Sequence, residues 1–289
     1  MEQGVVRANG VDFTYLVDGP ADGPLALCLH GFPDTAHTWR YLIPRLADSG
    51  FRAVAPFMRG YAPSTVPDDA AYDTGTLAVD ACELHDALGG DGQAVLIGHD
   101  WGAFAAYGAA ASEPDRWRRL VTLAVPPLAA MGSAFLQYDQ LRRSWYIFFF
   151  QTPLAEQAVA QDDLDFVDRL WADWSPGYDG PHDVAWVKDA LRDPPNLAAA
   201  IGYYRTAFTG PPADARAAAA QAAAVTVAPQ PTLCLHGRDD GCLGIDLVDS
   251  AADFLSPGSE MVVVDGAGHF VHVERPDEVG DHIIRFVTG

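Results

Sequence analysis

Residues 94–102 read AVLIGHDWG and open a run of small residues that extends to Ser112. The first four residues are continuously apolar, which is typical of a strand buried on both faces of a sheet. The alanine-rich residues after Asp100 favour a helix. Gly98 and Gly102 flank the junction, where residues without a side chain permit a sharp turn. The segment therefore predicts a strand, a tight turn and a helix, with the side chain of Asp100 presented at the turn.

Short apolar runs alternate with helical patterns on both sides of this segment. Buried strands are predicted over residues 13–17, 25–29, 53–55, 120–124, 232–235 and 261–264. Helices are predicted around Trp39–Leu46 and over residues 76–88, 245–255 and 276–287. Such an alternation of strands and helices indicates a mostly parallel sheet with helices on both faces.

The middle of the chain, residues 128–224, has a different pattern. It contains no convincing buried strand, but it has several helix-like stretches and turn signals such as the Ser-Pro-Gly of residues 175–177. Its alanine-rich end, residues 217–224, favours a helix that leads back to the sheet. We therefore predict one α/β core formed by residues 1–127 and 225–289, with residues 128–224 inserted as a helical cap.

The chain is strongly acidic. It has 289 residues, of which 49% are hydrophobic, and its 39 Asp and Glu against 18 Lys and Arg give a formal net charge of −21. This composition excludes a disordered or fibrous protein. A negative field of this size repels phosphate, so nucleic acid and anionic membrane surfaces are expected to be poor partners.

The cysteines, the histidines and the N-terminal residues indicate neither a metal site nor export. The four cysteines form no C-x-x-C pair, and neither they nor the nine histidines show metal-ligand spacing. We expect reduced thiols in a cytoplasmic protein without a metal or an organic cofactor. No signal peptide is recognised, and no apolar run approaches the ~20 residues of a membrane span. The oligomeric state is not indicated.

Four segments together resemble the α/β-hydrolases, and within them the epoxide hydrolases that use an aspartate nucleophile. They are residues 30–33 (HGFP), 59–61 (RGY), 98–102 (GHDWG) and 266–270 (GAGHF). The resemblance covers nearly the whole chain and keeps the family's order of nucleophile, acid and base. The chain departs from the pattern at residues 57–58, where many relatives carry an acidic residue, and at Ala62, where glycine is usual. The resemblance implies a mostly parallel eight-stranded sheet, helices on both faces and a helical cap.

The residue at the turn, Asp100, can be interpreted as a helix-capping aspartate or as a nucleophile. The strand and helix around it and the resemblance favour the nucleophile. A carboxylate is ionised at neutral pH and needs no base in order to attack. Its attack on an sp³ carbon gives an ester that water can hydrolyse, whereas a serine would leave an inert ether. An aspartate at this position therefore points to an epoxide or a carbon–halogen bond.

The resemblance also implies which residues hydrolyse such an ester. His269 is the expected general base, and a carboxylate must hold its tautomer. Relatives place that acid three residues after a glycine, which selects Asp240, with the adjacent Asp239 as the alternative. The backbone N–H groups of Phe32 and Trp101 are expected to form an oxyanion hole. The other conspicuous polar residues are interpreted as structural: His30, His99, His272 and Glu274.

Two tyrosines of the predicted cap, Tyr146 and Tyr204, match the pair with which epoxide hydrolases protonate the leaving oxygen. Opening an epoxide leaves an alkoxide, so an acid must meet it. Tyr203 remains the alternative to Tyr204. An apolar substrate pocket is expected beside these tyrosines. Its predicted lining is Phe32, Trp101, Phe149 and Phe150.

The sequence thus favours an epoxide hydrolase that converts a small apolar epoxide and water into a vicinal diol. A haloalkane dehalogenase on the same scaffold is the alternative, although that family usually has asparagine in place of Phe32. A fluoroacetate dehalogenase is disfavoured because residues 103–106 read AFAA where arginines are expected. A hydrolase fold that only binds a ligand has no reason to keep Asp100, Asp240 and His269 within mutual reach.

Overall fold

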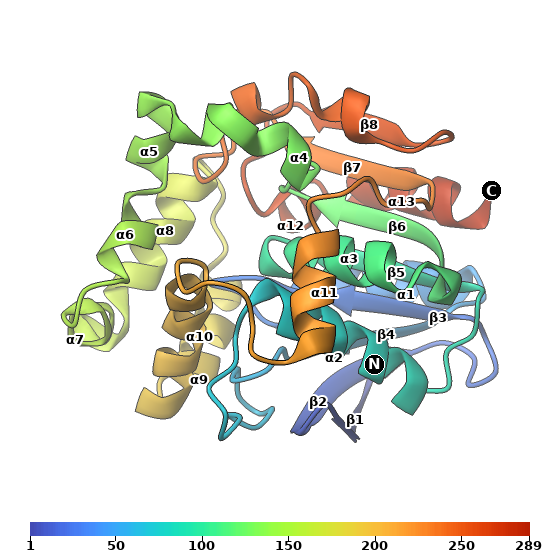
Figure 1. Ribbon diagram of the computed structural model, residues 1–289, viewed down its shortest axis with the longest axis horizontal. Helices are drawn as coiled ribbons and strands as arrows, with labels where there is room; N and C mark the ends of the chain where they lie inside the picture. Colours follow the sequence, from blue (N-terminus) through green and yellow to red (C-terminus); the bar gives the residue numbers. More distant parts are fainter.

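An eight-stranded sheet forms the centre of the protein, in the order β1-β2-β4-β3-β5-β6-β7-β8 (Figure 1). The structure is a computed structural model that describes the backbone of residues 1–289 and every side chain except that of Ser133. β1 and β2 pair antiparallel, and all pairings from β4 through β3 to β8 are parallel. This sheet confirms the predicted fold class. The strands are β1 (Glu2–Ala8), β2 (Val11–Asp18), β3 (Leu25–Leu29), β4 (Arg52–Pro56), β5 (Ala94–His99), β6 (Trp117–Leu123), β7 (Thr232–Gly237) and β8 (Glu260–Val264).

The central strands are buried on both faces, as their apolar runs predict. Every residue of β3 and β5 is buried, so helices have to cover both sides of the sheet. The edge strand β1 has a different pattern, in which exposed residues such as Glu2, Gln3 and Arg7 are common. Because β1 lacks a continuous apolar run, the sequence pattern did not predict it.

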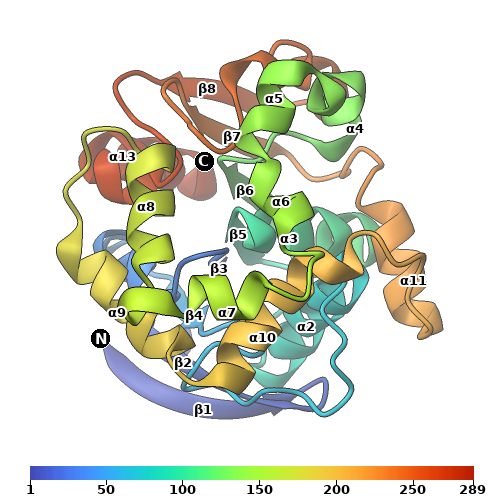
Figure 2. The ribbon, with the colours of Figure 1, turned by 90° about the vertical axis from the view of Figure 1, so that its left-hand side faces the viewer.

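Helices cover the two faces of the sheet in two groups (Figures 1 and 2). One group is α2 (Thr74–Ala87), α3 (Trp101–Ser112) and α11 (Ala215–Ala223), which pack against one another. The other group is α1 (Leu42–Asp48), α12 (Val271–Glu274) and α13 (Pro276–Thr288). None of the described helices combines the length and the apolar character that crossing a membrane requires.

The residues between β6 and α11 form a separate group of short helices, which Figure 1 shows to the left of and above the sheet. The described residues of this segment contain no strand. Its helices are α4 (Leu128–Met131), α5 (Tyr138–Arg143), α6 (Trp145–Phe149), α7 (Ala155–Val159), α8 (Asp165–Trp174), α9 (Pro181–Leu191) and α10 (Pro194–Thr206). The 3₁₀ turns of the chain are η1 (Ala36–Tyr41), η2 (Pro114–Arg116), η3 (Gly132–Leu136), η4 (Gln161–Asp163), η5 (Ile245–Leu247) and η6 (Ala251–Phe254).

Two details differ from the sequence-based expectation. The predicted division places residues 215–223 in the cap, but α11 packs against α2 and α3 of the core, where the small buried residues Ala217 and Ala220 allow a close approach. The helix predicted over residues 245–255 is wrong, because this segment forms only the turns η5 and η6. Its aspartates and Ser250 favour local hydrogen bonds over a continuous helix.

Candidate active site

Asp100 lies at the turn between β5 and α3 in a strained backbone conformation. Its φ is 50° and its ψ is −119°, a region that residues with a side chain rarely adopt. The flanking glycines make this turn possible. A Cβ on Gly98 would lie 2.3 Å from the carbonyl oxygen of Gly102, and a Cβ on Gly102 would lie 2.2 Å from that of Leu29. The turn therefore requires both glycines and lifts the Asp100 carboxylate off the end of the sheet.

The Asp100 carboxylate is buried and accepts backbone hydrogen bonds. The N–H of Phe32 donates to Oδ1 of Asp100 at 2.7 Å. Burial raises the pKa of Asp100, while the nearby His269 and His99 and the N–H groups of Phe32 and Trp101 oppose that rise. The two N–H groups expected to form an oxyanion hole thus act on the nucleophile candidate itself, and they favour its ionised form.

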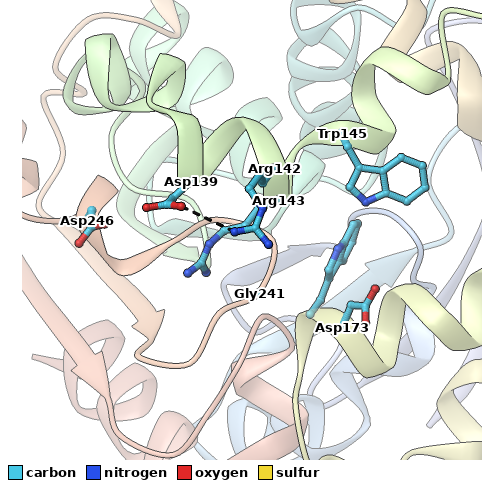
Figure 3. Close-up of a pocket in the computed structure, with 8 residues that line it drawn as sticks. Asp139, Arg142, Arg143, Trp145, Asp173, Gly241 and Asp246 are labelled. Atoms are coloured by element: carbon cyan, nitrogen blue, oxygen red, sulfur yellow. Dashed lines mark ion pairs between the residues drawn. The ribbon is translucent and has the colours of Figure 1, made fainter.

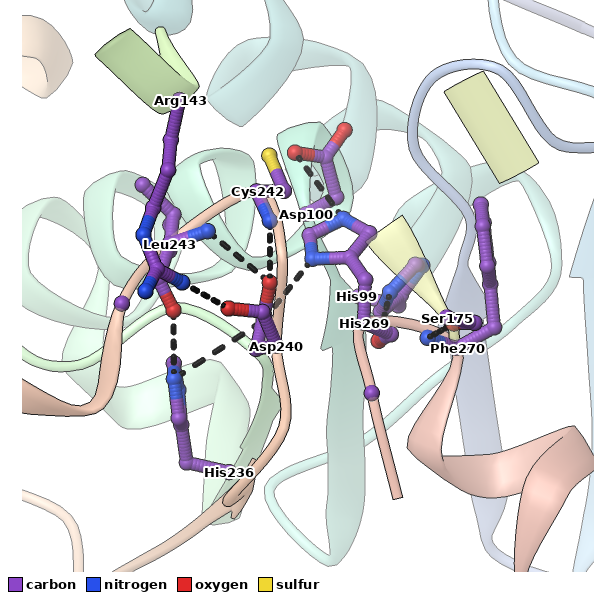
Figure 4. Close-up of polar contacts among 12 residues, drawn as sticks. His99, Asp100, Arg143, Ser175, His236, Asp240, Cys242, Leu243, His269 and Phe270 are labelled. Atoms are coloured by element: carbon purple, nitrogen blue, oxygen red, sulfur yellow. Dashed lines mark hydrogen bonds and ion pairs between the residues drawn. The ribbon is translucent and has the colours of Figure 1, made fainter. Parts of the chain in front are cut away.

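His269 and Asp240 complete a triad with Asp100 (Figure 4). Nδ1 of His269 lies 3.0 Å from Oδ2 of Asp240, and Nε2 lies 3.8 Å from Oδ2 of Asp100. The N–H groups of Cys242 and Leu243 donate to Oδ1 of Asp240 at 2.7 and 2.9 Å. The neighbouring Asp239 is exposed. Of the two aspartates that the sequence left open, the structure brings Asp240 to the histidine.

The buried pair of His269 and Asp240 polarises both groups. Burial alone would lower the pKa of His269, but the charge of Asp240 and its hydrogen bond raise it. Burial alone would raise the pKa of Asp240, but the attraction of His269 lowers it. Asp240 therefore keeps a proton on Nδ1 of His269 and leaves Nε2 facing Asp100 as the acceptor.

The C-terminus of α8 is hydrogen-bonded to the two loops that carry Asp240 and His269. The carbonyl oxygen of Trp174 accepts hydrogen bonds from the N–H groups of Gly241 and His269, each at 3.0 Å. The indole of Trp174 also packs edge-on against the imidazole of His269, with ring centroids 5.1 Å apart. α8 therefore meets the loops of the sheet core at His269 itself.

The next cap residue, Ser175, adds a second fastening. Its Oγ accepts a hydrogen bond from the N–H of Phe270 at 3.2 Å and donates to Oε1 of Glu274 at 2.6 Å. Oε2 of Glu274 accepts from the N–H of Gly268 at 2.8 Å. Glu274, which the sequence analysis treats as structural, holds the loop on either side of His269.

A cluster that the sequence analysis did not connect lies behind His269. Nε2 of His99 lies 3.0 Å from the carbonyl oxygen of His269, and Nδ1 of His99 lies 3.6 Å from Oδ2 of the buried Asp34. His272 is hydrogen-bonded to Thr38 in the same cluster. His99 thus supports the backbone of the base. Asp34 directly follows the HGFP segment, and that adjacency was the only signal for it in the sequence.

Tyr146 on α6 and Tyr204 on α10 lie together above Asp100. Both are buried, and their ring centroids are 5.4 Å apart. The hydroxyl of Tyr204 has no hydrogen-bond partner among the described residues, whereas that of Tyr203 donates to the carbonyl oxygen of Arg59 at 2.9 Å. Burial raises the pKa of Tyr146 and of Tyr204 well above its ordinary value, so both phenols keep their protons.

A largely apolar cavity of about 400 Å³ connects these groups. Its polar floor and roof are Asp100, Tyr146, Tyr204 and Cys242, and its apolar walls include Leu128, Met131, Phe104 and Phe135.

Of the four residues expected to line a substrate pocket, Trp101 lines this cavity. Phe32, Phe149 and Phe150 are not among the lining residues. Phe150 is fully buried and packs edge-on against Phe32 and Tyr204, so it forms a layer behind the tyrosines. Phe149 instead stacks on Phe166. Part of the apolar wall comes from Leu128, Met131 and Phe135, which belong to no motif.

Comparisons with known proteins identify the family. Residues 24–276 match the family model for the alpha/beta hydrolase fold. The chain is 32% identical to "Epoxide hydrolase A" of Mycobacterium tuberculosis over 99% of this chain and 97% of the relative. The chain belongs to the α/β-hydrolase family.

A further relative and two solved structures similar to this α/β-hydrolase are also named as epoxide hydrolases. The chain is 29% identical to "Epoxide hydrolase 3" of Mus musculus, over 98% of this chain and 75% of the relative. Its structure superposes on that of "Epoxide Hydrolase A" from Mycobacterium thermoresistibile with a TM-score of 0.83 at 27% identity, covering 100% and 98% of the two chains. It also superposes on the epoxide hydrolase of Bacillus megaterium in complex with an inhibitor. The TM-score is 0.84 at 25% identity, and the match covers 99% of this chain and 100% of the other.

A second hollow of this α/β-hydrolase, of about 350 Å³, lies outside the triad between α5 and the loop at Gly241 (Figure 3). It is lined by charged residues of both signs, and Arg142 and Asp139 form an ion pair there. Asp100 is not among its lining residues. The apolar cavity over Asp100 is therefore the candidate substrate site.

Two buried groups of potential metal ligands occur in this α/β-hydrolase. They are Asp34, His99 and His272, and Asp240, Cys242 and His269, with the ligand atoms of each group within 4.8 Å of one another. In the second group, Asp240 and His269 are already bonded to each other, and burial raises the pKa of the Cys242 thiol well above its ordinary value. A protonated thiol is a poor metal ligand.

Proposed function

We propose that this α/β-hydrolase converts epoxides into vicinal diols through an ester on Asp100. One observation carries the proposal: a buried carboxylate, with an imidazole 3.8 Å to its side, faces two protonated phenols across an apolar cavity. This arrangement offers a nucleophile, a base and two acids to one small molecule. The names of the relatives support an epoxide as that molecule.

In the first step, a carboxylate oxygen of Asp100 attacks a ring carbon of the epoxide. The bond between that carbon and the ring oxygen breaks, and its electron pair goes to the oxygen. Tyr146 or Tyr204 donates a proton to this oxygen, which becomes the first hydroxyl of the product. Because the phenols stay protonated over a wide pH range, they are ready to act as acids at neutral pH.

In the second step, Nε2 of His269 takes a proton from water, and the resulting hydroxide attacks the carbonyl carbon of the Asp100 ester. The negative charge that develops on the carbonyl oxygen meets the N–H groups of Phe32 and Trp101. When the intermediate collapses, the bond between the Asp100 carbonyl carbon and the ester oxygen breaks, and the departing alkoxide takes the remaining proton of the water, so the diol carries one oxygen from the epoxide and one from Asp100. The oxygen of the water stays in the Asp100 carboxylate, and the proton on His269 returns to the tyrosine.

The two phenols favour this proposal over haloalkane hydrolysis. A departing halide needs hydrogen-bond donors but no proton, and Phe32 offers no side-chain donor where dehalogenases usually have asparagine. An inactive binding protein is also disfavoured, because Asp100, Asp240 and His269 lie within mutual reach. Four buried free cysteines fit the cytoplasmic location that we propose.

A substrate panel tests the function. Aryl, aliphatic and fatty-acid epoxides are assayed beside haloalkanes with the wild type and with Asp100→Asn. We expect diol from at least one class of epoxide with the wild type and none with the variant. A single turnover in H₂¹⁸O should place the label in the peptide that contains Asp100. Halide release without diol formation, or diol without label in that peptide, would overturn the proposal.

A further inference from the structure

Tyr146 has an unusual partner for a proton donor. Its Oη lies 3.4 Å from Sγ of Cys242, a buried residue that also lines the cavity over Asp100. Sulfur is a weak hydrogen-bond acceptor and the thiol a weak donor. The Cys242 thiol stays protonated because burial and the nearby charges of Asp240 and Asp100 raise its pKa. The contact therefore orients the phenol without binding it strongly.

The backbone of Cys242 is held by hydrogen bonds on both sides, which fixes the position of the thiol. The N–H of Cys242 donates to Oδ1 of Asp240 at 2.7 Å, as Figure 4 shows. The carbonyl oxygen of Cys242 accepts from Nε2 of the buried Gln140 at 2.9 Å, and Oε1 of Gln140 accepts from the N–H of Gly244 at 2.9 Å. Because Gln140 lies on α5 of the cap, this short segment links the acid of the triad to the part of the cap that carries Tyr146.

A second tyrosine next to a buried cysteine shows the difference. Tyr107 lies near Cys234 in the core, but its hydroxyl is bonded to Oγ1 of Thr122 at 2.8 Å and to the carbonyl oxygen of Val125 at 3.0 Å. Two oxygen partners fix that hydroxyl permanently. Among the described residues, the hydroxyl of Tyr146 has only the sulfur of Cys242 as a partner, so an incoming oxygen atom can displace this partner at little cost.

We infer that Cys242 is a positioning residue for Tyr146: its thiol directs the phenol toward the cavity above Asp100 and releases it when the epoxide oxygen arrives. This inference rests on the proposed function and concerns its first step. Cys242 itself touches no reacting atom in this scheme. Its effect on catalysis passes through Tyr146 alone, and this property can be measured.

The test is a double-mutant cycle on the full-length protein. Cys242→Ala is made in the wild type and in Tyr146→Phe, and the rate of epoxide consumption is measured in a single turnover with excess enzyme. We expect Cys242→Ala to slow this first step about fivefold to tenfold in the wild type and not at all in Tyr146→Phe. Hydrolysis of the ester should be unchanged. Cys234→Ala, the matched control, should leave the first step within about twofold of the wild type.

Equal slowing by Cys242→Ala in both backgrounds, or no slowing in the wild type, would overturn the inference. Should Cys242→Ala fold poorly, Cys242→Ser is the second variant, and it should lose its effect in Tyr146→Phe in the same way. The inference is also overturned if the wild type consumes epoxide and Tyr146→Phe consumes it at the same rate. If the wild type forms no diol from any epoxide, the proposed function fails first, and this role fails with it.

Discussion

The sheet side and the cap side of the site are held in opposite ways. On the sheet side, both carboxylate oxygens of Asp240 are hydrogen-bonded, and the N–H of Phe32 holds the carboxylate of Asp100. On the cap side, the hydroxyl of Tyr204 has no partner among the described residues, and that of Tyr146 has only a thiol. The phenols are instead positioned by ring contacts, such as those of Tyr204 with Trp101 and Phe32, both at 5.1 Å.

In the proposed reaction, this difference follows from the chemical task of each side. A carboxylate that must stay charged while buried needs hydrogen-bond donors, because an unpaired buried charge is costly. A phenol that must transfer its proton to a substrate needs a free hydroxyl, and aromatic packing can fix its ring without occupying that hydroxyl. The comparison teaches that the hydroxyl of Tyr204, left without a partner among the described residues, distinguishes the proposed acids as clearly as dense hydrogen bonding distinguishes the carboxylates of Asp100 and Asp240.

Removing the base should give the largest effect and separate the two sides. In His269→Gln the nucleophile and the phenols remain, so the first step should proceed and the ester should accumulate. We expect steady-state turnover to fall about a thousandfold. Intact-protein mass spectrometry should show one added substrate mass. The double variant with Asp100→Asn is the control and should show no adduct; slow turnover of His269→Gln without an adduct would contradict the ester.

Removing the phenols should give the next largest effect, confined to the first step. Tyr146→Phe and Tyr204→Phe should each lower kcat/KM for epoxides about tenfold or more, and the double variant about a hundredfold. Tyr107→Phe, whose hydroxyl is bonded in the core, serves as the control. Unchanged epoxide turnover in the double variant would remove the cap side from the mechanism.

The pH dependence should report the sheet side. Protonated His269 cannot accept a proton, and Asp240 raises the pKa of His269 above its ordinary value. Where ester hydrolysis limits turnover, kcat should therefore increase about tenfold per pH unit below that pKa and level off above it. Asp240→Asn removes the attraction, so its increase should occur at lower pH. An increase at the same pH in both proteins would show that Asp240 does not act on the base.

Removing the hydrogen bond of Ser175 beside His269 should have the smallest effect on turnover. Ser175→Ala leaves the buried N–H of Phe270 without a partner and should cost about 1–2 kcal/mol in the free energy of unfolding, with kcat falling about threefold. Ser64→Ala is the matched control, because Oγ of Ser64 likewise accepts from one backbone N–H and donates to one oxygen, here the carbonyl oxygen of Phe57. Both variants should lose stability in chemical denaturation. An equal loss of kcat in the two would show that Ser175 has no particular link to His269.

The sequence predicted what depends on local pattern. The short apolar runs located seven of the eight strands. Gly98 and Gly102 located the turn, because steric limits on the backbone decide which single residues can stand there. The choice between Tyr203 and Tyr204 stayed open, since both line the cavity and only contacts across the fold show that the hydroxyl of Tyr203 is bonded to Arg59 while that of Tyr204 has no partner among the described residues. The cavity walls at residues 128–135 and the support of His99 by Asp34 depend on contacts across the fold, for which a single sequence has no local signal.

The bond from His269 to the carbonyl oxygen of Trp174 has a consequence for substrate entry. A roof that swung open on a hinge would pull this oxygen away and disturb the proton acceptor each time a molecule came or went. We therefore expect substrate to enter without movement of α8, whose Trp174 carries this hydrogen bond. Substrate is then expected to pass the exposed residues of the cavity lining, Phe208 after α10 and Val225 after α11.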